Sequence, residues 1–157
     1  MLFRSDPRYF KKPKLGMALT ALAGPLSNLL FAFFTVPVFY LVTWGYTEAF
    51  LSLGSGAFLV RFLDTMRSFI GTLHFMNLGL SVFNLIPIPP LDGSRILFFF
   101  LPTRHYFGIM RYERYTALIL MLCLVFGANF GFLTTVENFI SGVMSAAWAW
   151  LPALLLR

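Results

Sequence analysis

Charged side chains are scarce in this 157-residue sequence. Lysine and arginine together number 12 and aspartate and glutamate 6, so only 11% of the residues are charged while 59% are hydrophobic. A soluble domain has about 25% charged and about 45–50% apolar residues, so this composition excludes an ordinary soluble protein. Because the apolar runs are long and lipid offers no partner for an open backbone, we predict an all-α, polytopic membrane helical bundle.

The net charge of +6 does not indicate a nucleic-acid partner, because the basic residues lie in short segments beside apolar runs. Residues 1–14 contain five basic side chains against one acid, whereas the charges of residues 45–67 sum to zero. Positive loops stay in the cytoplasm. The pattern therefore predicts a cytoplasmic basic loop at 1–14, a non-cytoplasmic segment at 45–67 and a lipid bilayer as a partner.

Cysteine and histidine are also nearly absent. The single cysteine, Cys123, excludes a disulfide framework and a structural zinc site within the chain, and we interpret it as a small packing residue. The two histidines, His74 and His105, lie 31 positions apart and neither has a glutamate beside it. We predict that His74 is a hydrogen-bonded residue inside the bundle, that His105 lies at the membrane interface, and that neither binds metal.

Long apolar runs predict about four transmembrane helices in a single domain, 1–157, with both termini in the cytoplasm. Pro25 and Pro37 are predicted to kink the first helix. Segment 57–66 is predicted to form a short interfacial helix, and 96–101 is too short to cross. The four predicted crossings are 16–44, 68–87, 116–133 and 137–156.

The second run has its polar residues on one face. Four of them fall at i, i+3, i+7 and i+10, so the stripe must point into the bundle, because lipid cannot satisfy it. The first run has a complementary face of small residues at four-residue spacing, which would let another backbone approach. The polar stripe is His74, Asn77, Ser81 and Asn84, and the small face is Gly16, Thr20, Gly24 and Asn28.

Three prolines in four residues end the second run. Pro87, Pro89 and Pro90 remove backbone donors, so the chain must unwind between residues 84 and 92, which membrane proteins tolerate only where protein or water covers it. Asn84 could bind the freed backbone groups. The next acid, Asp92, could cap the following helix or bind a divalent cation.

These residues resemble a known family. Asn84-x-x-Pro87-x-x-x-Leu91-Asp92-Gly93 is similar to the Asn-x-x-Pro-x-x-x-Leu-Asp-Gly motif of the site-2 protease family of intramembrane zinc metallopeptidases, and Ala23-Gly24-Pro25-Leu26-Ser27-Asn28 resembles its Gly-x-x-x-Asn element. The resemblance implies that Asp92 is a zinc ligand, that Asn28 helps hold the substrate or the oxyanion, and that Asn84 supports the site. It places Pro87, Pro89, Pro90 and Gly93 in the cleft for a transmembrane protein substrate.

The family's His-Glu-x-x-His sequence, which supplies two zinc ligands and the general base, is absent. The resemblance therefore implies the C-terminal portion of such a protease, truncated at its N-terminus and inactive in isolation, in the inner membrane of a prokaryote. Two alternatives stay open: a non-catalytic membrane binding or regulatory protein that keeps the protease fold, and a transporter fragment, because transporters also use broken helices. The oligomeric state is not predicted.

Overall fold

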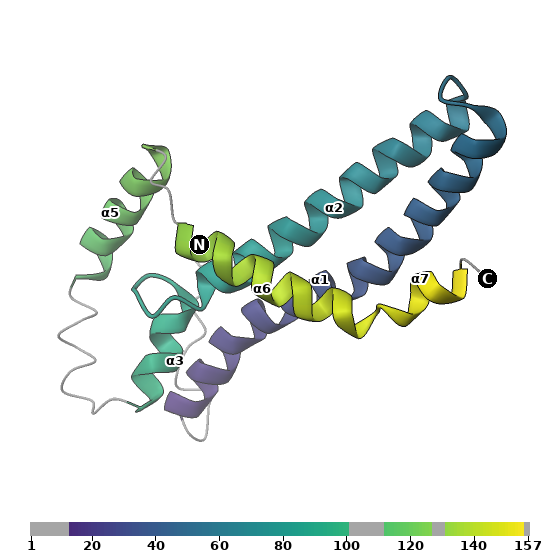
Figure 1. The fold of residues 1–157 in the computed structure, drawn as a ribbon. Helices are drawn as coiled ribbons and strands as arrows, with labels where there is room; N and C mark the ends of the chain where they lie inside the picture. The colour runs from purple at the N-terminus through teal and green to yellow at the C-terminus, as the bar shows by residue number, and fades with distance from the viewer. Residues whose placement is uncertain (1–12, 101–111, 127–130, 156–157) are drawn as a thin grey trace. The chain divides into compact units, whose positions relative to one another are not determined.

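The computed structural model describes residues 13–100, 112–126 and 131–155, and every regular element in them is a helix (Figure 1). The predicted all-α class is therefore confirmed. The described residues divide into two compact units, the first built from 13–27, 80–100, 112–126 and 131–133 and the second from 28–79 and 134–155. The helices are α1 (Pro13–Leu53), α2 (Phe58–Asn84), α3 (Asp92–Phe100), α5 (Glu113–Val125), α6 (Gly131–Ala147) and α7 (Trp150–Leu155).

Two stretches of the described helices are long and apolar enough to cross a membrane, Leu15–Leu53 and Gly131–Leu155. The first stretch contains the predicted crossing at 16–44. The second contains all of the predicted crossing at 137–156 except residue 156. The predicted crossing at 68–87 falls mainly in α2, whose last helical residue is Asn84. The described residues of the third, 116–126 and 131–133, belong mostly to α5, a helix of 13 residues that begins before it at Glu113. The count of about four crossings therefore stays a prediction.

Helix α1 runs without interruption through both of its internal prolines, Pro25 and Pro37. Proline removes one backbone donor in a helix, yet neither residue ends α1. The helix is 41 residues long, so it extends nine residues beyond the predicted end of the first crossing at Trp44.

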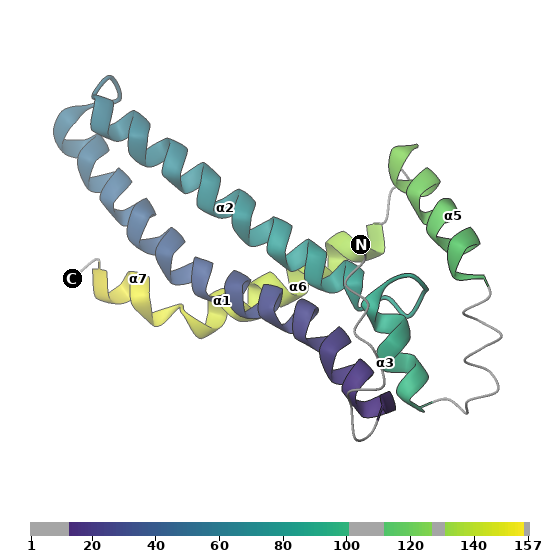
Figure 2. The same cartoon turned by 180° about the vertical axis from the view of Figure 1, so that it is seen from behind.

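In the second unit, α1 and α2 form an antiparallel hairpin, and they lie side by side in two opposite views (Figures 1 and 2). Gly54 closes the end of α1 with a φ of 77°, a left-handed conformation that glycine adopts without strain. Its amide donates to the Phe50 carbonyl at 3.0 Å. The predicted interfacial helix at 57–66 is wrong as a separate element, because α2 is continuous from Phe58.

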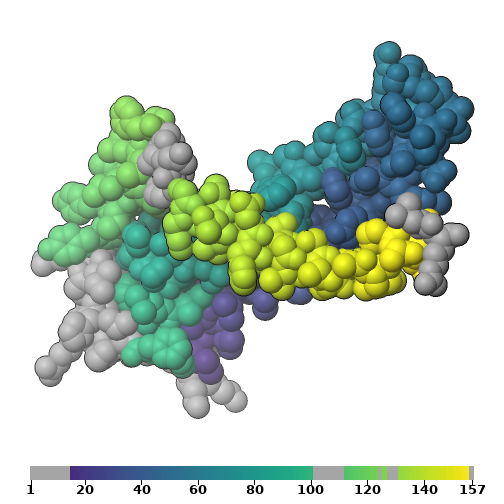
Figure 3. Space-filling model, viewed as in Figure 1, coloured from purple at the N-terminus to yellow at the C-terminus, as the bar shows by residue number. Residues whose placement is uncertain are grey.

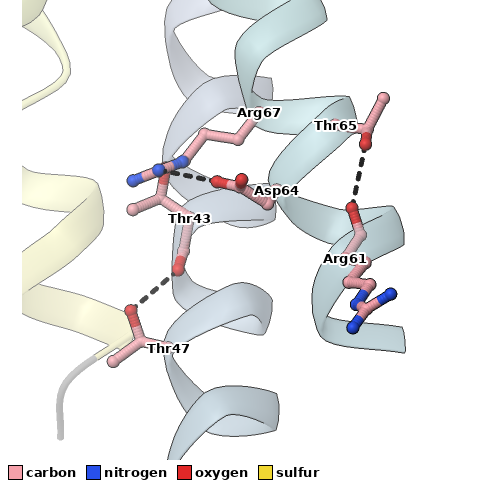
Figure 4. A network of polar contacts seen from close by, with 6 residues as sticks. All are labelled: Thr43, Thr47, Arg61, Asp64, Thr65 and Arg67. Carbon is pink, nitrogen blue, oxygen red and sulfur yellow. Dashed lines mark hydrogen bonds and ion pairs between the residues drawn. The ribbon is translucent and has the colours of Figure 1, made fainter. Parts of the chain in front are cut away.

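Several charged and hydroxyl groups near the end of this hairpin have local partners (Figure 4). Arg67 pairs with Asp64 at 2.8 Å, and its guanidinium lies 4.8 Å from the centre of the Tyr46 ring. Thr47 and Thr65 donate to carbonyls one turn earlier in their own helices, at 2.9 Å each. Side chains that hydrogen-bond within their own helix allow polar residues to remain close to an apolar environment.

The second unit has a small apolar core in which α1, α2 and α6 meet. Its buried members are Ala32, Val36, Leu78 and Met144. Phe33 and Trp148 pack against them, and the centres of these two rings are 5.4 Å apart. Helix α6 runs antiparallel to α2, because Glu137 lies against Gly79 while Ser141 reaches His74. Figure 3 shows one face of α6 and α7. Both helices have exposed apolar side chains, among them Phe139, Val143, Trp150 and Leu154.

In the first unit, the end of α2 connects through residues 85–91 to α3, a helix of nine residues. It is too short to cross a membrane, as the sequence predicts for this segment. Its buried residues are Gly93, Ser94 and Phe98. The candidate site lies where α3 begins.

Candidate active site

The predicted break in the second apolar run is confirmed. Helix α2 ends at Asn84, α3 begins at Asp92, and residues 85–91 are not helical. Prolines at 87, 89 and 90 supply no amide hydrogen, so the helical bond pattern cannot continue through them. Short backbone bonds replace it, among them Ile88 N–H to the Ile86 carbonyl at 2.8 Å and Leu91 N–H to the Ile88 carbonyl at 3.0 Å. The turn is thus held largely by its own backbone.

Gly93 lies against the backbone of this turn. A Cβ atom at this position would overlap the Leu85 carbonyl group and come within 2.6 Å of the Ile86 carbonyl oxygen. Real Cβ atoms essentially never approach a backbone atom this closely, and a carbonyl group cannot rotate away as a flexible side chain can. The absence of a side chain at Gly93 is therefore what allows α3 to start directly beside the end of α2.

Asp92 presents a carboxylate that has no partner in the part of the chain that the structure describes. It is half-buried at the first residue of α3, where the helix N-terminus favours negative charge. Within the described segments no hydrogen bond or ion pair joins its carboxylate to another residue, so it does not cap the amides of α3. A Cβ built on Gly24 of α1 would lie 3.6 Å from Asp92 Oδ2. The carboxylate therefore lies directly against the small face of α1.

Ser81 joins α2 to α1 at Pro25, the residue after Gly24. Its hydroxyl donates to the Pro25 carbonyl at 2.8 Å, and its side chain is fully buried. The sequence predicts that Ser81 points inward, and this is confirmed, but the prediction assigned it no part in the site. Its position on the polar stripe, about one turn before the helix breaks, could have indicated that Ser81 lies near the site.

The other predicted site residues are not all brought together. Asn84 is half-buried and donates no hydrogen bond to the turn within the described residues, so the predicted support of the freed backbone is not observed. Pro89 is buried, whereas Pro87 and Pro90 are exposed. Asn28 follows Gly24 by one turn of α1 and belongs to the second unit.

His74 is a buried structural residue, as the sequence predicts. Its Nδ1 lies 3.0 Å from the Ala32 carbonyl and 3.1 Å from Thr35 Oγ1, and its Nε2 lies 3.0 Å from Ser141 Oγ. Because a carbonyl only accepts, Nδ1 donates and, in the neutral ring, Nε2 accepts from Ser141. Both ring nitrogens are engaged with α1 and α6, so His74 is not available as a metal ligand. His105 lies outside the described residues.

Catalytic zinc requires three protein ligands and an open position for water. Among the residues that the structure describes, no three His, Cys, Asp or Glu side chains gather in one place. Asp92 fits the role of one ligand, since its carboxylate is half-buried, unpaired and next to a glycine. The described residues therefore fit a single zinc ligand and do not form a zinc site by themselves.

Comparison with known proteins agrees with the motifs. The sequence profile of peptidase family M50 matches residues 4–128, which is most of the chain. The chain belongs to peptidase family M50. This confirms the resemblance to site-2 proteases drawn from the turn and from the Gly-x-x-x-Asn element, and the M50 match includes both of them.

A protein similar to this M50 chain is "Putative zinc metalloprotease YwhC" of Bacillus subtilis (strain 168), with 39% identity over 90 residues. The matched region is 57% of this chain and 37% of YwhC, so the chain corresponds to well under half of that relative. No solved structure matches the chain. Membership of M50 supports a metalloprotease type of enzyme and zinc as its metal.

Proposed function

We propose that this M50 chain forms part of an intramembrane zinc metalloendopeptidase that hydrolyses peptide bonds in transmembrane segments of other proteins. Asp92 would be one zinc ligand. The observation that carries the proposal is the unpaired Asp92 carboxylate at the start of α3, held against Gly24 directly after a proline-broken helix. An uncompensated carboxylate in or near a membrane is costly, so a bound divalent cation is its natural partner.

The turn at 85–91 suits a protein substrate. A transmembrane substrate is helical, and a peptidase must expose its backbone before the bond can be cleaved. We propose that the non-helical turn, with Pro87 and Pro90 exposed, lines the cleft where this happens and that Asn28 and Asn84 contribute amide groups. Both amides are half-buried and have no hydrogen-bond partner among the described residues, so they are free to bind a peptide carbonyl.

Bound zinc would supply a Lewis acid and an activated water. We propose that its other two ligands and the general base come from a His-Glu-x-x-His sequence outside these 157 residues, so that the chain alone has no peptidase activity. The contribution of this chain is then to hold one carboxylate at a fixed place. The reading frame preceding residue 1 tests this directly, because a gene without that sequence would not encode the proposed enzyme.

Zinc content is the decisive measurement. The protein expressed from its full reading frame should purify with about one zinc per chain, and Asp92→Ala should lower the affinity at least about tenfold, as expected for a lost ligand. The matched control is Asp64→Ala, because Asp64 is paired with Arg67 and lies in the second unit. Unchanged zinc affinity in Asp92→Ala would contradict the metal role and favour a non-catalytic membrane protein with the same fold.

We place the protein in the inner membrane of a prokaryote, with lipid and a transmembrane substrate as partners and both termini cytoplasmic. The basic segment 1–14 supports a cytoplasmic N-terminus. For the C-terminus two observations differ: the loop charges favour the cytoplasm, whereas the antiparallel contact of α6 with α2 favours the opposite side. Alkaline phosphatase fused after Arg157 distinguishes them, because it is active only outside the cytoplasm.

A further inference from the structure

We propose that Ser81 is a positioning residue that fixes the Asp92 carboxylate against α1, an inference that rests on the proposed metal role of Asp92. Ser81 is the last inward-facing residue of the polar stripe before Asn84, and its side chain is fully buried in the first unit. Its hydroxyl donates to the Pro25 carbonyl at 2.8 Å. Pro25 directly follows Gly24, the position at which an added Cβ would lie 3.6 Å from Asp92 Oδ2.

A closed sequence of contacts connects Ser81 to Asp92. The Ser81 carbonyl accepts from the Leu85 amide at 3.1 Å, which fixes the first residue of the turn. The carbonyl group of Leu85 in turn lies against Gly93. Gly93 is covalently next to Asp92, whose Oδ2 returns to α1 beside Gly24. Each step lies within the first unit, and the last one is the 3.6 Å that would separate a Cβ on Gly24 from Asp92 Oδ2. We therefore infer that the place of the carboxylate depends on where Ser81 holds α2.

Burial makes the Ser81 bond difficult to replace. The Ser81 hydroxyl has neither water nor lipid around it, because its exposed fraction is 0%. Without the hydroxyl, α2 keeps its apolar contacts with α1. It loses the directional hydrogen bond that fixes its axial position relative to α1.

Cysteine cross-linking measures this position without reference to metal. In a Cys123→Ser background, Gly24→Cys and Asp92→Cys report the distance between α1 and the start of α3 in the first unit, since a Cβ at residue 24 makes an ordinary 3.6 Å contact with Asp92. A matched glycine–acid pair, Gly79→Cys and Glu137→Cys, reports the α2–α6 contact in the second unit, where the corresponding separation is 3.2 Å. Disulfide formation with copper–phenanthroline is followed in detergent micelles.

Ser81→Ala should slow cross-linking of the 24–92 pair by about threefold to tenfold, the effect of one lost interhelical hydrogen bond, and leave the 79–137 pair unchanged. Ser141→Ala removes a different interhelical bond, the one to His74, and should show the reverse pattern. Equal slowing of both pairs by Ser81→Ala, or no slowing of the 24–92 pair, overturns the positioning role.

The same cross-linking result keeps this inference separate from the proposed function. If the unsubstituted full-length protein contains no zinc, the metal role fails, whereas the rate for the 24–92 pair still decides whether Ser81 positions residue 92. If zinc is present and the 24–92 rate does not respond to Ser81→Ala, the positioning role fails and the metal role stands.

Discussion

The start of α3 packs against the backbone of the preceding turn at Gly93, where there is no room for a side chain. Gly93 has the Leu85 and Ile86 carbonyl groups where any other residue would have its Cβ. The Leu-Asp-Gly sequence therefore has two physical roles side by side, a carboxylate that is free to bind and a glycine that lets the chain approach closely. A larger residue at 93 would push α3 away from α2 and move Asp92 with it.

Gly93→Ala should accordingly destabilise the protein by about 1–3 kcal/mol, the range for overpacking a closely packed site. The measurement is the free energy of unfolding in mixed micelles titrated with sodium dodecyl sulfate. Gly142→Ala is the matched control, because a Cβ at Gly142 meets nothing within 4 Å and alanine is the better helix former. Equal stability of the two variants would show that the turn relaxes without cost.

At the scale of elements, α2 contributes residues to both units, each of which it stabilises separately. Its polar stripe makes interhelical bonds in both, from Ser81 to α1 in the first unit and from His74 to α1 and α6 in the second. Polar side chains between helices in a membrane are modest stabilisers, averaging about 0.6 kcal/mol and reaching about 1.7 kcal/mol. Their larger effect is to define which faces of the helices meet.

Ser141→Ala should lower the free energy of unfolding by about 0.6 kcal/mol, since it removes the hydroxyl that His74 Nε2 contacts at 3.0 Å. Ser145→Ala, one turn later on α6, should change it by much less, because that hydroxyl donates only to carbonyls of its own helix. Unfolding in the same detergent titration compares the two. A larger loss in Ser145→Ala than in Ser141→Ala would contradict this account of the second unit.

At the scale of the whole molecule, the proposed cytoplasmic location of the basic segment and one crossing by α1 together predict that residues 54–57 lie outside the cytoplasm. In a Cys123→Ser background, Ser55→Cys should therefore react with a membrane-impermeant maleimide added to intact cells. Ser68→Cys, which lies further along α2, is the control and should react much more slowly. Labelling of Ser55→Cys only after cell lysis would contradict the orientation.

Local patterns predicted the features that depend on neighbouring residues. Prolines without amide hydrogens predicted the break after Asn84, and helical spacing predicted the inward side chains of His74 and Ser81. The start of α2 at Phe58 was missed, since Arg61, Asp64 and Arg67 lower the hydropathy without preventing a helix. The contact of Asp92 with Gly24 joins residues 68 positions apart, and no local pattern encodes such a distance.

Helix α1 is longer than the bilayer needs. At about 1.5 Å per residue its 41 residues extend roughly 60 Å, whereas the hydrocarbon core is about 30 Å thick, and Glu48 is its only charged residue between Leu15 and Leu53. A rod with so much surplus apolar surface meets a thicker membrane by standing more upright and a thinner one by leaning further. The hairpin should therefore adapt to membranes of different lipid composition by a change in the tilt of α1.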